Sequence, residues 1–235
     1  IGSRRDGGFA EYVAVPVWNI VKLPESTPFT HAAMLEPLSV ALHAIRLGGV
    51  KRGDKVAIVG TGMIGISAGQ WAYKMGASSV TIIGRNNTKK VLVESCGLHY
   101  LVYTMAENLN QYDFVLEAVG TPKAIEMSVR AVRPGGTVLL MGNPSGDIPF
   151  SQNLYWRILR KQLTLKGTWN STYDGTNPSD WTDAIKAISN KEINVEPLVS
   201  HCFSQEELMD GLLLMRDHIE PYCKVMTVWN NESSK

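Results

Sequence analysis

Residues 56–70 read VAIVGTGMIGISAGQ, an apolar run that meets three glycines within six positions and then continues as a second apolar segment. Gly60, Gly62 and Gly65 fit the pattern G-x-G-x-x-G. The residues before Gly60 are continuously apolar, as in a buried strand, and those after Gly65 repeat at helical spacing. The stretch therefore predicts a strand, a tight turn and a helix.

A turn of this kind is typical of a site for the pyrophosphate of a dinucleotide. The first glycine permits the bend, the second lets the backbone approach the phosphates, and the third lets helix and strand pack closely. Free N–H groups at the helix start then face the anion. A glycine-rich turn without a ligand is the alternative, but the agreement of strand, spacing and helix favours the binding turn.

The end of the second strand, in SVTIIGRNNTKK at 79–90, bears on which dinucleotide binds. NAD sites usually carry an acidic residue there, about 20 residues beyond the motif. This chain has Gly84 followed by Arg85, with Lys89 and Lys90 one turn later. A guanidinium without a neighbouring carboxylate suits a 2′-phosphate, so the sequence favours NADP over NAD. Ordinary solvated charges are the alternative, and the missing acid also weighs against a methyltransferase.

Apolar runs alternate with segments of helical period from Lys55 to about Gly167. This alternation predicts a doubly wound α/β domain, with a parallel sheet of about six strands. The expected strands are 55–59, 79–84, 114–120, 137–142 and 163–169, with a weaker one at 99–103.

The flanking segments predict further elements. Residues 7–24 are aromatic and β-branched, which indicates two short strands. Residues 26–50 indicate a short helix with Thr30 as N-cap, a break near Glu36 caused by Pro37, and a longer helix that ends at Gly48 and Gly49. Later we expect helices at 180–190 and 205–218 and a strand at 223–229.

Composition narrows the class of protein. With 235 residues, 44% of them hydrophobic, the chain can bury a core, and a net charge of +1 gives no reason to expect nucleic acid or a membrane as partner. We read the basic cluster Arg157, Arg160 and Lys161 as a solvated helix face. No apolar run of about 18 residues and no leader is present, so we expect a cytoplasmic protein. The three cysteines, Cys96, Cys202 and Cys223, argue against a disulfide framework.

Five motifs follow one another along the chain: GGFAEYVAV (7–15), LEPLSVALHA (35–44), GDKVAIVGTGMIG (53–65), RPGGTVLLMG (133–142) and LRKQLTLKGTW (159–169). In this order and spacing they resemble the zinc-dependent medium-chain alcohol and polyol dehydrogenases. The likeness is greatest to the sorbitol dehydrogenase branch, and there to the galactitol-1-phosphate 5-dehydrogenases.

The resemblance implies a Rossmann domain inserted between two parts of a mainly β, GroES-like catalytic domain. The parts would be 1–34 and 169–235, with the dinucleotide-binding domain at 35–168. It also implies a homodimer or homotetramer with 163–169 near the subunit contact. The family's main zinc ligands and structural zinc lobe would precede Ile1, so we expect this chain to be a fragment.

The resemblance also implies site residues. Glu36, in the family's Glu-Pro sequence, would lie beside the catalytic zinc, directly or through water, whereas its structural reading is a helix-end carboxylate. Thr168 and Trp169 would approach the nicotinamide. Together with Lys89 and the residues that follow the fourth and fifth strands, where ligands of such sheets bind, the resemblance gives this candidate cofactor set: Gly60, Gly62, Met63, Ile64, Gly65, Gly84, Arg85, Lys89, Ala118, Val119, Gly120, Met141, Gly142, Asn143, Thr168 and Trp169.

Four further residues are candidates for either a functional or a structural role. His43 suits a proton path, although packing on its neighbours is favoured. Arg4 and Arg5 suit a clamp on a substrate phosphate, with solvated loop charges as the default. Glu117, inside an apolar run, is read as structural.

In the intact enzyme the implied chemistry is hydride transfer between a secondary alcohol of a polyol or polyol phosphate and the nicotinamide, with zinc lowering the pKa of the hydroxyl. This chain would bind NADP without turning over an alcohol. A zinc-free reductase of the quinone-reductase type and a non-catalytic nucleotide-binding module remain as alternatives.

Overall fold

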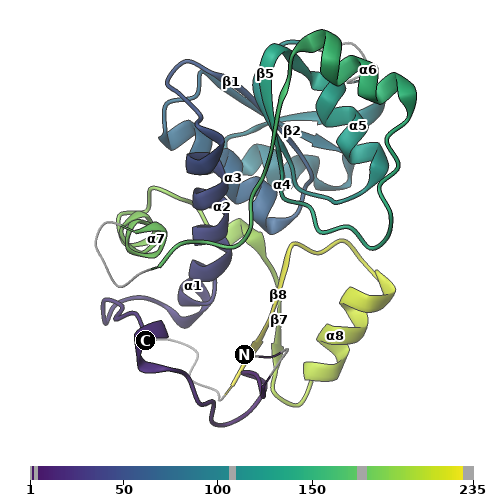
Figure 1. Ribbon diagram of the computed structural model, residues 1–235. Helices are drawn as coiled ribbons and strands as arrows, with labels where there is room; N and C mark the ends of the chain where they lie inside the picture. The colour runs from purple at the N-terminus through teal and green to yellow at the C-terminus, as the bar shows by residue number, and fades with distance from the viewer. Residues whose placement is uncertain (1, 3–4, 106–109, 174–178, 230–235) are drawn as a thin grey trace.

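The central feature of the fold is one parallel sheet of six strands in the order β3-β2-β1-β4-β5-β6 (Figure 1). The computed structural model describes residues 2, 5–105, 110–173 and 179–229. The sheet confirms the predicted doubly wound domain, including the weak strand near His99. Its strands are β1 (Lys55–Val59), β2 (Ser79–Gly84), β3 (His99–Val102), β4 (Tyr112–Glu117), β5 (Val132–Leu140) and β6 (Thr164–Gly167).

Helices cover both faces of the sheet. On β1, Val56 and Ile58 point into one core, whereas Ala57 and Val59 point into the other. Because both faces are buried, the strands read as continuous apolar runs rather than alternating ones. One face is covered by α2 (Leu35–Gly48), α3 (Met63–Lys74) and α4 (Lys90–Ser95), and the other by α5 (Pro122–Ala131) and α6 (Gln152–Lys161).

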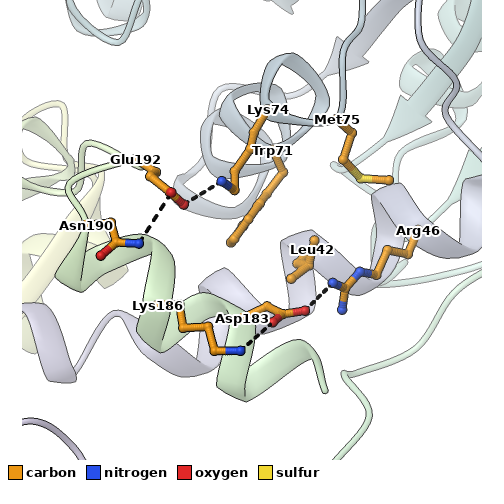
Figure 2. A pocket seen from close by; sticks show the side chains of 9 residues that line it. All are labelled: Leu42, Arg46, Trp71, Lys74, Met75, Asp183, Lys186, Asn190 and Glu192. Atoms are coloured by element: carbon orange, nitrogen blue, oxygen red, sulfur yellow. Dashed lines mark hydrogen bonds and ion pairs between the residues drawn. The ribbon is translucent and has the colours of Figure 1, made fainter. Parts of the chain in front are cut away.

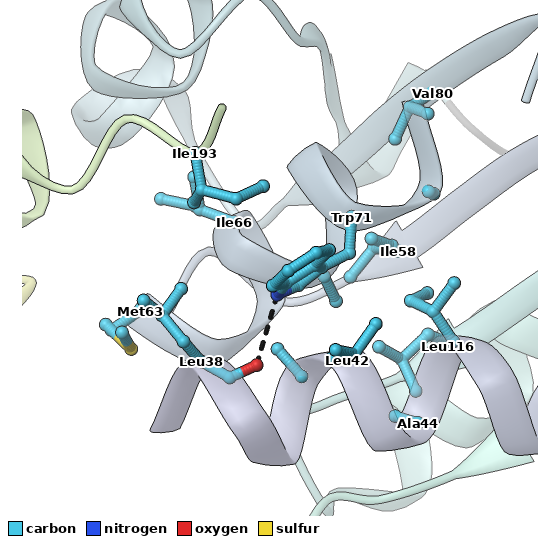
Figure 3. Close-up of a cluster of buried hydrophobic side chains, with 14 of the residues drawn as sticks. Leu38, Leu42, Ala44, Ile58, Met63, Ile66, Trp71, Val80, Leu116 and Ile193 are labelled. Atoms are coloured by element: carbon cyan, nitrogen blue, oxygen red, sulfur yellow. Dashed lines mark hydrogen bonds between the residues drawn. The ribbon is translucent and has the colours of Figure 1, made fainter. Parts of the chain in front are cut away.

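Trp71 fixes the contact between α2 and α3. Its ring is almost wholly buried among aliphatic side chains of the first core, and its Nε1 donates a hydrogen bond to the Leu38 carbonyl at 3.1 Å (Figure 3). A buried indole needs such a partner for its N–H. The helix that follows the glycine turn, α3, is therefore packed firmly against α2.

The helical region before the sheet differs in detail from the expectation. α1 (Phe29–Ala32) follows Pro28 as N-cap, so Thr30 lies inside it. α2 begins at Leu35, which places the break at 33–34 rather than near Glu36. Pro37 therefore lies in the first turn of α2, where a missing N–H breaks no helical hydrogen bond. Gly49, at φ 72°, ends α2 as predicted.

The prediction of two strands within 7–24 was wrong. The described residues of this stretch contain only the short helix η1 (Val17–Asn19). Most large side chains of the stretch face solvent, Tyr12 with 91% of its surface exposed, whereas Leu23 packs against the core. Strand formation needs a partner strand to pair the backbone groups, and the described part of the chain supplies none here. Aromatic and β-branched residues indicate strand propensity but not the presence of that partner.

The basic cluster on α6 also departs from the expectation of a solvated face. Arg160 is exposed, but Lys161 is buried and Arg157 is half-buried. The Lys161 ammonium lies against α5, whose last carbonyl groups it contacts. Charge alone did not reveal that this lysine faces inward.

The last third of the chain adds a helix on α2 and a small second sheet. α7 (Asp180–Ser189) packs along α2, and β7 (Val199–Ser204) and β8 (Lys224–Val228) pair in parallel beside α8 (Leu208–Asp217) (Figure 1). The two expected helices and the closing strand are confirmed. Single helical turns lie at η2 (Asn87–Lys89), η3 (Tyr103–Met105) and η4 (Glu196–Leu198). Among the described helices, none has the length and apolarity that crossing a membrane requires.

Candidate functional site

The carboxyl ends of the strands gather the predicted residues at one edge of the sheet. The chain turns from β1 toward β2 on one side and from β4 toward β5 on the other, which makes the β1–β4 junction the switch point where ligands of such sheets bind. Backbone hydrogen bonds join the successive loops: Gly60 to the Ile83 carbonyl at 3.1 Å, Ala118 to Val59 at 2.9 Å, Met141 to Glu117 at 2.9 Å and Thr168 to Leu140 at 3.0 Å.

The glycine turn lies directly over this junction. Gly60 has φ 131°, and a Cβ there would come within 3.0 Å of the Ala118 carbonyl oxygen. A Cβ on Gly65 would lie 2.6 Å from the Gly60 oxygen. These two positions therefore require glycine, one for the bend and one for the close approach of α3 to β1.

Gly62 differs from both, because a Cβ there would meet nothing within 4 Å. α3 begins at the next residue, Met63, and no side chain among the described residues caps it. The first N–H groups of the helix are thus without a side-chain cap, and the helix dipole adds positive potential there. The turn fits the pyrophosphate of a dinucleotide.

The loops after β4 and β5 pack backbone against backbone. A Cβ on Gly142 would lie 2.0 Å from the Gly120 nitrogen, and Gly120 has φ 82°. Glu117, 1% exposed, accepts hydrogen bonds from the Val119 and Gly120 nitrogens at 2.8 Å each through its Oε1. Its carboxylate shapes the loop that holds Ala118, Val119 and Gly120, which supports the structural reading. Asn143 is exposed beside them.

At the end of β2 the structure gives a physical reason for Gly84. A Cβ there would lie 1.9 Å from the Tyr100 hydroxyl oxygen and 2.8 Å from the Thr61 methyl carbon, so any larger side chain, an acidic one included, would have to displace Tyr100. Burial raises the pKa of Tyr100, which keeps the phenol neutral, and its hydroxyl donates to the Asn86 carbonyl. The sequence showed that no acidic residue stands at the end of β2. It did not indicate the contact with Tyr100, because no local pattern predicts it.

Two cations border the glycine turn on this side. Arg85 is exposed and forms no ion pair with any residue the structure describes. The Lys89 ammonium donates to the Thr61 carbonyl within the turn at 3.3 Å and lies 5.8 Å from the centre of the Tyr222 ring. Beside Tyr222, burial raises the pKa of the Cys223 thiol to about 11, so this thiol stays neutral. The potential at the end of β2 is positive.

Thr168 and Trp169 follow β6 at the same edge. The Thr168 hydroxyl oxygen is buried and has no hydrogen-bond partner among the described residues. Trp169 is 72% exposed. Because buried hydroxyls are normally paired, the orphaned Thr168 oxygen suits a site that a ligand completes.

Glu36 lies in the first turn of α2, where it is exposed. The part of the chain that the structure describes contains no group of three or more His, Cys, Asp or Glu side chains that could hold a metal ion. These residues therefore do not make a zinc site by themselves, and the role of Glu36 stays a prediction.

The remaining candidates are His43, Arg4 and Arg5. The half-buried His43 packs against α7, and its Nδ1 donates to Asp180 at 2.9 Å. Sequence reasoning missed Asp180, because an acid in the first turn of a helix is common. Arg5 is exposed, and Arg4 lies outside the described residues.

A cavity of about 390 Å³ lies between α2, α3 and α7 (Figure 2). Its charged side chains pair with one another: Arg46 with Asp183 at 2.5 Å and Lys74 with Glu192 at 2.5 Å. It is lined by the final turns of α3, and α3 starts at the glycine turn, so the cavity lies toward the opposite edge of the sheet. It is not part of the candidate site.

The chain is similar to known proteins along most of its length. The model of a family described as zinc-binding dehydrogenase matches residues 64–190. Galactitol 1-phosphate 5-dehydrogenase of Escherichia coli K12 is 33% identical over 222 residues, which cover 90% of this chain and 64% of that protein. The chain therefore spans less than two thirds of this relative's length.

Two solved structures are similar along most of the chain. The crystal structure of galactitol-1-phosphate dehydrogenase from Escherichia coli has a TM-score of 0.85 at 32% identity, with 96% of this chain and 68% of that chain covered. A Sinorhizobium meliloti protein, described as a zinc-binding dehydrogenase and bound to NADP, has a TM-score of 0.84 at 28% identity and coverages of 97% and 68%.

Proposed function

Since the chain belongs to the zinc-binding dehydrogenase family, we propose that its glycine turn binds the pyrophosphate of NADP and that the whole protein is an NADP-dependent oxidoreductase. One observation carries the proposal. The uncapped start of α3 faces open space at Gly62, next to a strand end that has two cations and no acid.

NADP is preferred to NAD in this proposal because of the end of β2. A carboxylate would repel the 2′-phosphate, and the position that carries one in NAD sites is Gly84 here, packed against Tyr100. Arg85 and Lys89 supply the positive charges that a 2′-phosphate needs. The NADP-bound relative from Sinorhizobium meliloti supports the same choice.

For the whole protein we propose hydride transfer between the nicotinamide and a secondary alcohol of a polyol or polyol phosphate. The name that the Escherichia coli relative and the similar Escherichia coli crystal structure share supports this substrate class. Zinc would assist with Glu36 beside it, but the described residues gather no zinc site. We therefore assign to this chain the binding and orientation of the cofactor, within a domain at 35–168 between two catalytic-domain segments, 1–34 and 169–235.

A homodimer or homotetramer in the cytoplasm completes the proposal. β6 pairs only with β5 among the described strands, so its outer edge is open. Large apolar side chains are exposed on and near this segment, including Trp156, Leu159 and Trp169. The three free thiols suit a reducing compartment. Sedimentation equilibrium of the purified chain tests the assembly, and a strict monomer would contradict it.

Calorimetric titration with NADPH and NADH side by side tests the cofactor proposal. We expect NADPH to bind at least about tenfold more tightly, since a charge-assisted hydrogen bond contributes about 1.5–3 kcal/mol. Arg85→Gln should remove most of this preference while leaving the affinity for NADH unchanged. Binding of neither reduced dinucleotide to folded protein would end the proposal.

A further inference from the structure

Asp180 is a buried carboxylate that the proposed binding of the pyrophosphate does not use. It lies in the first turn of α7, with only 5% of its side chain exposed. Its Oδ1 accepts from Arg46 Nη1 at 2.8 Å, and its Oδ2 accepts from His43 Nδ1 at 2.9 Å. A carboxylate is buried at such a position only where donors satisfy it.

The third donor belongs to a different segment. The backbone nitrogen of Thr172 donates to Asp180 Oδ2 at 3.0 Å. Thr172 ends the stretch 168–172, which leaves β6 and crosses toward α7. One carboxylate thus joins α2, α7 and this crossing segment.

The crossing segment is fixed at both ends. At its start Thr168 donates its N–H to the Leu140 carbonyl at 3.0 Å. At its end Ser171 Oγ accepts from Trp181 Nε1 at 3.1 Å, one residue before the bond to Asp180. Between them Asn170 has φ 55°, a conformation that asparagine tolerates better than most residues. These hydrogen bonds of the segment are made to β5 and α7. Its shape therefore depends on those elements.

We infer that Asp180 is a positioning residue for the nicotinamide half of the cofactor, an inference that rests on the proposed function. It holds the crossing segment against α2, and the segment carries Thr168, whose buried hydroxyl has no partner among the described residues, and Trp169. The adenosine half would be held separately by the glycine turn and by Arg85 and Lys89. Loss of the Asp180 carboxylate therefore affects one half of the ligand and spares the other.

Asp183 provides a matched control on the same helix. It accepts from the second guanidinium nitrogen of Arg46 at 2.5 Å, as Figure 2 shows, yet none of its hydrogen bonds reaches the crossing segment. Its side chain is 24% exposed. If Asp180 only secured α7 on α2, removal of either carboxylate would alter the protein in the same manner.

The test compares two ligands on three proteins. Calorimetry of wild type, Asp180→Asn and Asp183→Asn measures the affinities for NADPH and for adenosine 2′,5′-bisphosphate, which lacks the nicotinamide half. We expect Asp180→Asn to weaken NADPH by about tenfold while the bisphosphate changes less than about twofold. Asp183→Asn should change neither affinity by more than about twofold.

The outcomes are distinguishable. Equal weakening of both ligands in Asp180→Asn, or no weakening of either, overturns the positioning role and leaves the proposed function intact. Wild type that binds neither ligand overturns the proposed function itself. If Asp180→Asn does not fold, Ser171→Ala decides: weaker NADPH binding with unchanged bisphosphate binding supports the role, and unchanged NADPH binding overturns it.

Discussion

Gly62 separates the binding role of the glycine turn from its folding role. Its Cβ position is empty and its φ of −77° suits any residue, so Gly62→Val should fold normally. The new side chain would fill the space in front of the α3 N–H groups. We expect a melting temperature within about 2 °C of wild type and loss of NADPH binding by about a hundredfold or more, measured by calorimetry.

Gly60→Val is the contrasting variant. At φ 131°, with the Ala118 oxygen 3.0 Å from the Cβ position, it should lower stability markedly before any ligand is added. A Gly62→Val protein that retains wild-type affinity for NADPH would show that the pyrophosphate does not lie at this turn.

The sequence predicted the strand, the turn and the helix around the glycines, but not the contacts that distant residues make with them. The motif identifies glycines whose need is local, a bend and an approach of neighbouring backbone. The need for Gly84 is not local, because Tyr100 comes from β3. Asp180 likewise depends on donors from α2, far away in sequence.

At the scale of elements, the carboxyl end of α5 is capped by a side chain from α6. The Lys161 ammonium donates to the carbonyls of Val129 at 2.7 Å, Arg130 at 3.0 Å and Val132 at 2.8 Å. Burial, with Arg157 nearby, lowers the pKa of Lys161 to about 8, so the amine is still mostly protonated at pH 7. It then donates to two carbonyls that α5 itself leaves unpaired and to the carbonyl of Val132, the first residue of β5.

Lys161→Met should therefore destabilise the protein by about 2 kcal/mol, since three buried acceptors lose a charged donor. Urea denaturation at pH 7 measures the change. Arg160→Met, the same change one residue earlier on an exposed side chain, should alter stability by less than about 0.5 kcal/mol. Equal effects of the two substitutions would contradict the capping role.

Asp113 joins three strands at the other edge of the sheet. Its carboxylate accepts from the Lys55 nitrogen of β1 at 2.7 Å and from Arg133 of β5 at 2.6 Å. Partial burial raises the pKa of Asp113, but the hydrogen bonds from Lys55 and Arg133 outweigh this and leave the pKa below its usual value. A depressed pKa means that the carboxylate stabilises the fold above the unfolded-state pKa and loses this effect as the pH falls through the folded-state pKa.

We expect Asp113→Asn to lower the free energy of unfolding by less than about 1 kcal/mol at pH 7, because the side chain is partly exposed and solvent weakens the pair. The gap between wild type and variant should shrink as the pH falls from 5 to 3. Urea denaturation across this range measures it, and a gap that stays constant would rule out the carboxylate as its cause.

At the scale of the whole molecule, the sequence predicted the part of the fold that has regular alternation. Strands buried on both faces and helices between them leave a pattern that survives without tertiary information. The largely exposed stretch 7–24 has residues typical of strands but no partner strand among the described residues, so the prediction of strands there was wrong. Hydrogen bonds between segments that are distant in sequence leave no local pattern, yet these bonds connect the sheet domain to the last third of the chain.

One such joint is the pair of hydrogen bonds between Gln70 of α3 and the backbone of Asn194. Gln70 Nε2 donates to the Asn194 carbonyl at 3.0 Å, and the Asn194 nitrogen donates to Gln70 Oε1 at 2.7 Å. Because Gln70 is buried, Gln70→Leu would leave both backbone groups without partners. We expect a loss of about 1–3 kcal/mol in urea denaturation and faster amide exchange at Asn194 and along β7.

Lys74→Met supplies the control for this joint. Lys74 lies one turn further along α3 and reaches the same segment through Glu192 at 2.5 Å, but both side chains of this pair are 37% exposed. An exposed ion pair contributes about 0–1 kcal/mol, so its removal should scarcely change amide exchange in β7. If Lys74→Met accelerated exchange in β7 as much as Gln70→Leu does, the buried amide would not be what couples α3, and with it the glycine turn, to the last third of the chain.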